Sequence, residues 1–335
     1  IKFRTLDDQG NVSGGPMYYI THGFSGKWQI IAKPLAYFFA FAGVLVAWLG
    51  IGTFSQVNSI TSSLQNSFGW SPKIVSVILA LITAAIIFGG IQSISKVSEK
   101  VVPFMAGLYI IAALIVIFAN FNQLLPVLEM VFQSAFTGKA AVGGFAGATV
   151  MAAMRLGIAR GVFSNESGLG SAPIAAAAAK TEEPVEQGLI SMTGTFIDTI
   201  IICTLTGLAI LVTGQWSGSL EGAPMTQAAF SSIFGTFGEL ALTLSLVLFA
   251  FTTILGWSYY GERCFEFIFK STKFLSFYRL IFVVMVALGG YLTLEVVWKI
   301  ADIVNGLMAL PNLIALLVLS PIILKESKSY FERHK

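Results

Sequence analysis

The chain has 335 residues, of which 56% are hydrophobic and 11% are charged, with 20 basic and 17 acidic side chains. A soluble domain carries about 25% charged residues, and the mean hydropathy of this chain is +0.81, so its composition indicates an integral membrane protein. Its two cysteines and two histidines do not form a disulfide framework, a transition-metal site or a catalytic set, and we expect no cofactor and no enzyme activity.

Residues 1–32 are polar and rich in turn residues, and we expect a cytoplasmic or interfacial segment with a short helix from Met17 to Ile20. The charged opening, IKFRTLDDQGN, is typical of the tail of a helix already under way, so we expect further residues before it. The first span is expected at about 33–56. Its end, GIGTFSQVNS, contains glycines that permit close helix contact, whereas the amide of Gln56 suits a polar cavity.

Further apolar runs of about 20 residues are long enough to cross a hydrocarbon core of about 30 Å. They predict spans at about 74–91, 101–119, 187–212, 237–260, 277–294 and 301–324. We expect loops at 120–140 and 214–236, and a cytoplasmic tail at 325–335. Together with a broken span at 143–179, these spans predict eight crossings in a single transmembrane domain covering residues 1–335.

The stretch 159–180, ARGVFSNESGLGSAPIAAAAAK, interrupts a run that a membrane helix should continue. Gly168 and Gly170 loosen the backbone, and Ser171 with Pro173 then favours a new helix start. An unpaired backbone group at membrane depth costs on the order of several kcal/mol, so protein, water or ligand must satisfy it. Transporters use such breaks as binding sites. The alternative is a tight interfacial loop between two ordinary spans.

The basic residues test this layout. With the C-terminus inside, the inner segments carry Lys2, Arg4, Lys27, Lys33, Lys96, Lys100, Lys180, Arg263, Lys270, Lys273, Arg279, Lys325, Lys328, Arg333 and Lys335. The outer segments carry only Lys73, Lys139 and Lys299, while Arg155 and Arg160 lie in the broken span. This bias follows the positive-inside rule and predicts a multi-pass protein of the cell membrane with a cytoplasmic C-terminus.

Ionisable residues at membrane depth are functional hypotheses by default. Asp198 shares a helical face with Thr195 and Thr199, and Glu166 and Arg160 flank the break. One interpretation is ion or proton coupling. The other is a structural salt bridge from either carboxylate to an arginine of the broken span.

A second polar group lies in the run FAFTTILGWSYYGE. Phe249, Thr252 and Thr253 recur at i, i+3 and i+4, so one carbonyl and two hydroxyls can point the same way. Sodium is a hard cation that takes oxygen ligands of this kind, and Trp257 on the same face could wall a small pocket. The alternative is that the hydroxyls bond back to their own helix and that the tryptophan is an interfacial anchor.

Five motifs in order resemble the alanine or glycine:cation symporters, also called sodium:alanine symporters. They are GGPMYYI, GVFSNESGLGSAPIAAAAAKT, PVEQGLISMTGTFIDTIIICTLTGLAIL, ILGWSYYGE and ADIVNGLMALPNLIALL. The likeness covers essentially the whole chain. It implies an all-α leucine-transporter (LeuT) type inverted-repeat fold of eleven spans, of which this chain would hold eight. The first three spans, with another broken helix, would precede it.

The resemblance also implies site residues. It places Gln56, Phe163, Ser164, Asn165, Thr253 and Trp257 near the substrate, and Thr252 and Thr253 at sodium, where the spacing argument adds Phe249. Glu166, Asp198 and Arg160 are the candidates for coupling or structure. The chain departs from the family pattern at Ser167, where alanine is usual, and at Ala176, where histidine is usual, so we expect no histidine-linked role.

These observations predict a sodium-coupled symporter of small neutral amino acids, alanine and/or glycine, that works by alternating access. We expect a monomer in the lipid bilayer with no nucleic-acid partner. The alternative is a channel or a non-transporting structural or regulatory membrane fragment. A channel should line its pore with polar residues from several helices, whereas polarity here is concentrated in one break and one helix.

Overall fold

The computed structural model describes residues 1–136 and 146–334. Lys139, Lys335 and the expected start of the broken span at 143–145 therefore lie outside the described residues. The helices are α1 (Pro16–Gly23), η1 (Gly26–Trp28), α2 (Gln29–Leu49), α3 (Phe54–Phe68), α4 (Pro72–Ile87), α5 (Gly90–Ala119), α6 (Phe121–Phe136), α7 (Ala146–Asn165), α8 (Ala172–Ala176), α9 (Pro184–Phe196), the π-helix η3 (Ile197–Cys203), α10 (Thr204–Val212), η4 (Gln215–Ser217), α11 (Ala223–Phe269), η5 (Thr272–Phe274), α12 (Leu275–Gly289) and α13 (Leu294–Arg333).

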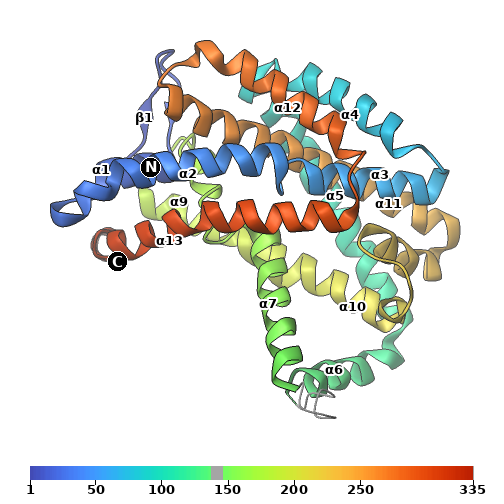
Figure 1. The fold of residues 1–335 in the computed structure, drawn as a ribbon. Helices are drawn as coiled ribbons and strands as arrows, with labels where there is room; N and C mark the ends of the chain where they lie inside the picture. Colours follow the sequence, from blue (N-terminus) through green and yellow to red (C-terminus); the bar gives the residue numbers. More distant parts are fainter. Residues whose placement is uncertain (137–145, 335) are drawn as a thin grey trace.

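The expected helical class is confirmed, with a small addition at the N-terminus. Strands β1 (Thr5–Leu6) and β2 (Val12–Ser13) form an antiparallel hairpin in which Thr5 pairs with Ser13. This hairpin lies at the end of the molecule where α13 finishes (Figure 1).

A bundle of helices α2, α3, α11, α12 and α13 holds the main core (Figure 1). Its largest buried side chains include Phe39, Trp257 and Tyr278, all at most 1% exposed. Close helix approach depends on small residues: a Cβ added at Gly43 would lie 2.6 Å from the Cys264 sulfur. Such contacts are typical of helices that pack within a membrane, where small residues let backbones approach.

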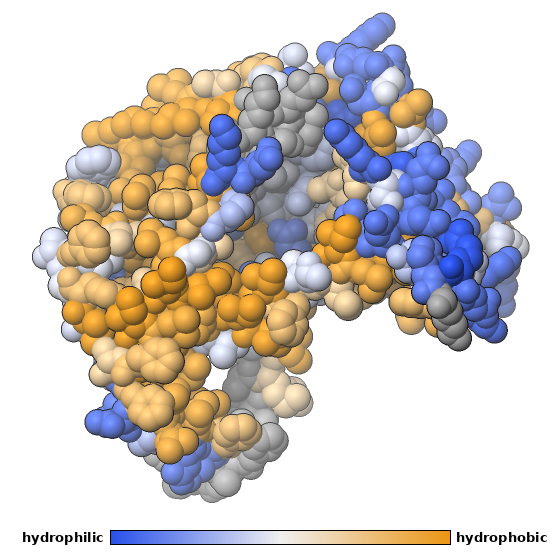
Figure 2. Space-filling view, turned by 180° about the vertical axis from the view of Figure 1, so that it is seen from behind, coloured by the Kyte–Doolittle hydropathy of each residue, from blue (hydrophilic) through white to orange (hydrophobic). Residues whose placement is uncertain are grey.

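Six helical stretches in the described part of the chain are long and apolar enough to cross a membrane. They are Gly26–Phe68, Glu99–Ala119, Pro184–Val212, Ala223–Phe269, Thr272–Gly289 and Leu294–Arg333, and a shorter apolar helix spans Pro72–Ile87. In Figure 2 apolar side chains cover most of the visible face, and hydrophilic ones gather toward the end that carries both termini. The protein is therefore a polytopic membrane protein, while the count of eight crossings stays a prediction.

The expected span at 33–56 falls within the apolar stretch Gly26–Phe68, but its helix is interrupted, because α2 ends at Leu49 and α3 begins at Phe54. Between them Gly50 and Thr53 leave helical geometry, with φ and ψ of −101° and −137°, and −135° and −69°. The Thr53 hydroxyl donates to the Ala47 carbonyl over 2.5 Å, which satisfies one acceptor freed by the interruption. We refer to residues 50–53 as the first break.

Two predicted loops are helical. Residues 121–136 form α6, and the interval 214–236 contains the start of α11 from Ala223 up to a kink at Gly235, whose φ is 59°. Burial explains the second helix: Phe230 is 2% exposed and its ring lies 5.5 Å from that of Tyr109. Packing on α5 therefore overrides the glycines and polar residues that favour a loop.

Helix α7 does not run alongside the bundle helices as an ordinary span would. Figure 1 shows it leaving the bundle at a steep angle, with α6 at its far end, and its main packing contact is with η3. Met151, Met154 and Ile158 are more than 60% exposed. Only its C-terminal end reaches the packed helices, where the chain enters the next interruption.

Candidate functional site

A second break separates α7 from α8. Residues 166–171 are irregular, and Glu166, Gly168 and Gly170 have positive φ angles of 55°, 83° and 90°. Helix α8 then begins directly after Ser171, but it covers only Ala172–Ala176 rather than the whole alanine run. The Ser171 hydroxyl does not cap this helix and instead donates to Oε2 of Glu166.

Side chains from distant segments satisfy carbonyls around the second break. Asn312 of α13 donates to the Gly168 carbonyl over 2.9 Å, and the Tyr19 hydroxyl donates to the other end of the Asn312 amide. Arg4 donates to the carbonyls of Ala177 and Ala179 over 3.0 and 2.8 Å. Protein donors therefore satisfy backbone carbonyls both in the turn and at the end of α8.

The sequence analysis missed these supporting residues. Asn312 had a signal, because a lone amide within an apolar span is costly unless it has a partner, and it is 3% exposed here. Arg4 carried no signal in the sequence apart from its charge. The sequence does not show that the N-terminal segment folds back onto α8.

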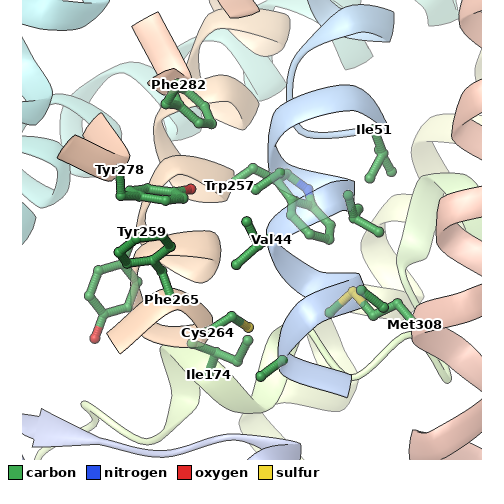
Figure 3. Close-up of a cluster of buried hydrophobic side chains, with 14 of the residues drawn as sticks. Val44, Ile51, Ile174, Trp257, Tyr259, Cys264, Phe265, Tyr278, Phe282 and Met308 are labelled. Atoms are coloured by element: carbon green, nitrogen blue, oxygen red, sulfur yellow. The ribbon is translucent and has the colours of Figure 1, made fainter. Parts of the chain in front are cut away.

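Trp257 of α11 connects the two breaks. Its indole Nε1 donates to Oε1 of Glu166 over 2.8 Å, and the residue is 1% exposed. A Cβ added at Gly52 would lie 2.7 Å from the Trp257 Cβ, so the first break packs directly against this side chain. Figure 3 shows Trp257 beside the α2 ribbon in the neighbourhood of Ile51. Two segments of interrupted helix thus meet on one aromatic residue.

Gln56 lies in the first turn of α3, next to the first break. Its Nε2 donates to the Ile51 carbonyl over 3.1 Å. The amide therefore satisfies a backbone carbonyl of the first break. Gln56 lies next to the same break that packs against Trp257. Its amide oxygen remains available as an acceptor.

Phe163 lies one turn before the second break, and its ring contacts that of Trp298 on α13. Its ring is 4.7 Å from that of Trp298, and the Arg160 guanidinium lies 4.1 Å over Trp298 and 5.4 Å over Phe163. Arg160 also forms an ion pair with Asp302. The structure thus brings Phe163 and Arg160 together in one cluster with α13.

The end of α7 is joined to η3 by four polar side chains. The Ser164 hydroxyl donates to Oδ1 and Oδ2 of Asp198 over 3.1 and 2.8 Å. Asn165 donates to the Thr199 hydroxyl over 2.9 Å, and Thr199 donates in turn to Asp198 over 3.3 Å. A π-helical turn, often found at functional sites, carries both η3 residues.

The structural salt bridge considered for the carboxylates is not formed within residues 1–136 and 146–334. Arg160 pairs with Asp302, and the Glu166 carboxylate accepts from Trp257 and Ser171. The Asp198 carboxylate accepts hydrogen bonds from the hydroxyl groups of Ser164 and Thr199. The arginines of α7 therefore do not neutralise either carboxylate.

Three oxygens converge on one face of α11. The hydroxyls of Thr252 and Thr253 donate to the Phe249 carbonyl over 2.9 and 3.0 Å. This is the back-bonding alternative, yet it also gathers a carbonyl and two hydroxyl oxygens; the carbonyl accepts both hydroxyl hydrogens, and the hydroxyl oxygens keep lone pairs of their own. Thr253 and Trp257 are one helical turn apart on the same helix.

Comparison with known proteins bears on this site. The model of the sodium:alanine symporter family matches residues 1–335. The chain is 50% identical over 337 residues to an uncharacterized transporter of Haemophilus influenzae, covering 100% of this chain and 72% of that protein. It is 46% identical to the sodium/alanine symporter AgcS of Methanococcus maripaludis, covering 100% and 73%. It is 38% identical to the probable sodium/glutamine symporter GlnT of Bacillus subtilis, covering 98% and 67%.

The matched relatives include transporters described for different amino acids, so they share a transport class rather than one substrate. The resemblance that the five motifs carry is confirmed over the whole length of the chain. This chain belongs to the sodium:alanine symporter family.

Proposed function

We propose that this protein is a sodium-coupled symporter of alanine and/or glycine that works by alternating access. Its membership of the sodium:alanine symporter family supports the transport class. The observation that carries the proposal is the meeting of the two breaks on Trp257. Interrupted helices expose backbone amides and carbonyls, which are the groups that hold the charged ends of an amino acid in a membrane.

The size of the substrate would be set by aromatic side chains around the breaks. Trp257 is fully buried between the first break and Glu166, and Phe163 lies one turn before the second break. Ser164, Asn165, Thr253 and Gln56 would supply the polar contacts. A bulky wall discriminates by about 1–3 kcal/mol per added methylene, so we propose that it favours alanine and glycine over longer amino acids such as glutamine.

The coupling ion would occupy the oxygens of Phe249, Thr252 and Thr253. A sodium ion there would replace the two back-bonded hydroxyl hydrogens and use the same three oxygens. Because Thr253 lies one turn from Trp257, ion binding and substrate binding would act on the same part of α11. We further propose a monomer in the cell membrane with its C-terminus in the cytoplasm, as the distribution of basic residues favours.

The test is uptake of isotope-labelled alanine by the full-length protein in proteoliposomes. With an inward sodium gradient we expect accumulation above the external alanine concentration, and collapsing the gradient should abolish it. Unlabelled alanine and glycine should compete, and glutamine should compete less. A sodium-independent flux that does not saturate would indicate a channel, and absence of alanine flux in either condition would overturn the assignment of alanine as substrate.

A further inference from the structure

A cavity of about 580 Å³ lies between the N-terminal hairpin, α1, the start of α2 and the end of α11. Figure 1 shows the hairpin, α1 and the start of α2 at one end of the molecule. None of the described residues that line this cavity belongs to either break or to the three oxygens on α11. The cavity is therefore separate from the candidate substrate and sodium sites.

The cavity lies at the level where two membrane-spanning stretches end. Lys33 is near the beginning of the apolar stretch Gly26–Phe68, and Lys270 directly follows the stretch Ala223–Phe269. Both lysines line the cavity, and so does Tyr37. Lysine and tyrosine at the ends of membrane spans are typical of the headgroup layer, where the polar tip meets water and the stem meets hydrocarbon. The cavity is therefore within reach of phospholipid headgroups.

Lys33 and Lys270 carry charges that no acidic side chain neutralises in the described part of the chain. Neither lysine takes part in an ion pair there. Lys270 also ends α11 with φ and ψ of 52° and 33°, a left-handed conformation that glycine usually adopts at the end of a helix. A residue other than glycine that is held in this conformation, with an unpaired charge beside a cavity, indicates a function for its side chain.

The carboxylates that line the cavity differ in how far they are occupied. The side chains of Asp7 and Glu266 are buried, and both form ion pairs with Arg263 over 3.1 and 2.7 Å. Asp8 is exposed and accepts from the backbone N–H of Thr272 over 3.2 Å, so its carboxylate keeps further acceptor capacity. The cavity thus presents two unpaired cations together with one accessible carboxylate.

An aromatic wall continues from the cavity along α2. The ring of Phe267 lies 5.2 Å from that of Tyr37 and 5.3 Å from that of Tyr18, and all three residues line the cavity. Phe41 follows Tyr37 one helical turn later and is 56% exposed, and Phe38 beside it is exposed as well. An acyl chain can therefore lie on these rings while its headgroup occupies the cavity. This apolar continuation favours a lipid over a free phosphate ion.

We propose that this cavity binds the headgroup of a zwitterionic phospholipid with a primary ammonium group, as in phosphatidylethanolamine. Lys33 and Lys270 would bind the phosphate, while the ammonium would donate to Asp8 and lie beside the rings of Tyr18 and Tyr37. Both ends of this headgroup meet a partner of opposite charge. An anionic headgroup would instead leave the Asp8 carboxylate without a positive partner from the lipid. The bound lipid would connect the start of α2 with the end of α11 and the hairpin.

The test measures lipid binding to the purified full-length protein by native mass spectrometry, so it does not depend on transport. Delipidated protein is titrated with phosphatidylethanolamine and, separately, with phosphatidylglycerol of the same acyl chains. We expect one equivalent of phosphatidylethanolamine to bind more tightly than phosphatidylglycerol. Lys33→Gln/Lys270→Gln should bind it about 30-fold more weakly, because each basic side chain near a lipid headgroup contributes a factor of about five.

A second variant tests the ammonium end of the site and keeps the test valid if the lysine variant fails to fold. Asp8→Asn can still accept from Thr272 through its amide oxygen, but it has no charge. It should bind phosphatidylethanolamine more weakly than the parent and phosphatidylglycerol more tightly.

The matched control is Lys325→Gln/Lys328→Gln, which removes two charges from exposed positions of α13 and should bind phosphatidylethanolamine as the parent does. An equal loss in both double variants would show unspecific attraction and overturn the cavity as the binding site. Phosphatidylglycerol bound as tightly as phosphatidylethanolamine by the parent would overturn the role of Asp8. Displacement of the lipid by millimolar inorganic phosphate would overturn the lipid as the ligand, and so would the absence of a bound equivalent in the parent.

Discussion

Trp257 donates its indole N–H to the Glu166 carboxylate over 2.8 Å and packs on its other side against Gly52. Glu166 has a positive φ of 55°, a conformation that costs a non-glycine residue on the order of 1–3 kcal/mol. The bond from Trp257 and the one from Ser171 hold that residue in place. Movement of α11 would therefore change the contacts of both breaks at the same time.

The first prediction concerns the Trp257 N–H. Trp257→Phe keeps an aromatic ring but leaves Oε1 of Glu166 without this donor, and an unsatisfied buried acceptor costs about 1–3 kcal/mol. We expect the alanine concentration for half-maximal uptake to rise about ten-fold, measured in proteoliposomes at saturating sodium. Trp257→Ala should in addition let larger neutral amino acids compete, or abolish alanine uptake.

Trp216 offers the matched control for that prediction. It lies in η4 and is 49% exposed, so Trp216→Phe should leave alanine uptake as in the parent. Unchanged affinity and unchanged selectivity in both Trp257 variants would remove Trp257 from the substrate site.

The second prediction concerns the sodium oxygens. Thr252→Val and Thr253→Ala each remove one hydroxyl that now donates to the Phe249 carbonyl. Because sodium would lose one of three proposed oxygen ligands, we expect the sodium concentration for half-maximal uptake to rise about ten-fold or more. The measurement is a sodium titration of alanine uptake.

The control for the second prediction is another threonine whose hydroxyl donates to a carbonyl of its own helix. Thr213 donates to the Ala209 carbonyl over 2.7 Å at the end of α10, so Thr213→Val removes the same kind of hydroxyl away from α11. A titration curve that does not move in either α11 variant would exclude the sodium role of that residue.

The helical membrane architecture could be predicted because composition and the length of apolar runs report it directly. The first break could not be predicted, since Gly50 and Gly52 suit close packing of an unbroken helix equally well. The side chains that pack against these two glycines, Val304 at Gly50 and Trp257 at Gly52, come from remote parts of the chain. The helix at the start of α11 could not be predicted either, because its burial depends on Tyr109, which is distant in the sequence.

The site shows a similar division between local and distant information. Asp198 and Thr199 are adjacent in the sequence and hydrogen-bonded, but the face that they were expected to share with Thr195 stays a prediction. The partner of Arg160 does not follow from spacing, because Asp302 is on α13 and nothing local indicates which helix lies opposite. Charge type was readable from the sequence, whereas charge pairing required the fold.

The third prediction tests the contact at the first break. Gly52→Ala would place a Cβ 2.7 Å from the Trp257 Cβ and 2.9 Å from the backbone of Ala47, so one of them must move. Overpacking of this kind costs about 1–3 kcal/mol, and we expect a lower melting temperature in detergent together with weaker alanine uptake. Gly107→Ala in α5 is the control, because the added Cβ meets no described atom within 4 Å. It should be neutral or slightly stabilising, and equal effects of the two substitutions would contradict the contact.

The last prediction concerns the hairpin that carries Asp7, outside the membrane-spanning stretches. Burial alone would raise the pKa of Asp7, but hydrogen bonds from Asn11, Gln9 and Arg263 outweigh it and hold that pKa below its ordinary value of 3.8. A lowered pKa means that the ionised form stabilises the fold above pH 3.8 and that this stabilisation is lost as the pH falls through the folded-state pKa.

Asp7→Asn should therefore lower the free energy of unfolding at neutral pH by about 1.5–3 kcal/mol, the usual contribution of a hydrogen bond to a charged group. Asp7 bonds to the buried Arg263 over 3.1 Å, so the loss also loosens the hairpin from α11. Melting curves in detergent should separate the variant from the parent at pH 7, and the separation should shrink as the pH falls below 3.8 through the lowered folded-state pKa of Asp7. Glu221→Gln, at an exposed carboxylate between η4 and α11, should match the parent at both pH values. A difference between Asp7→Asn and the parent that persists unchanged at low pH would show that the Asp7 charge is not what attaches the hairpin to α11.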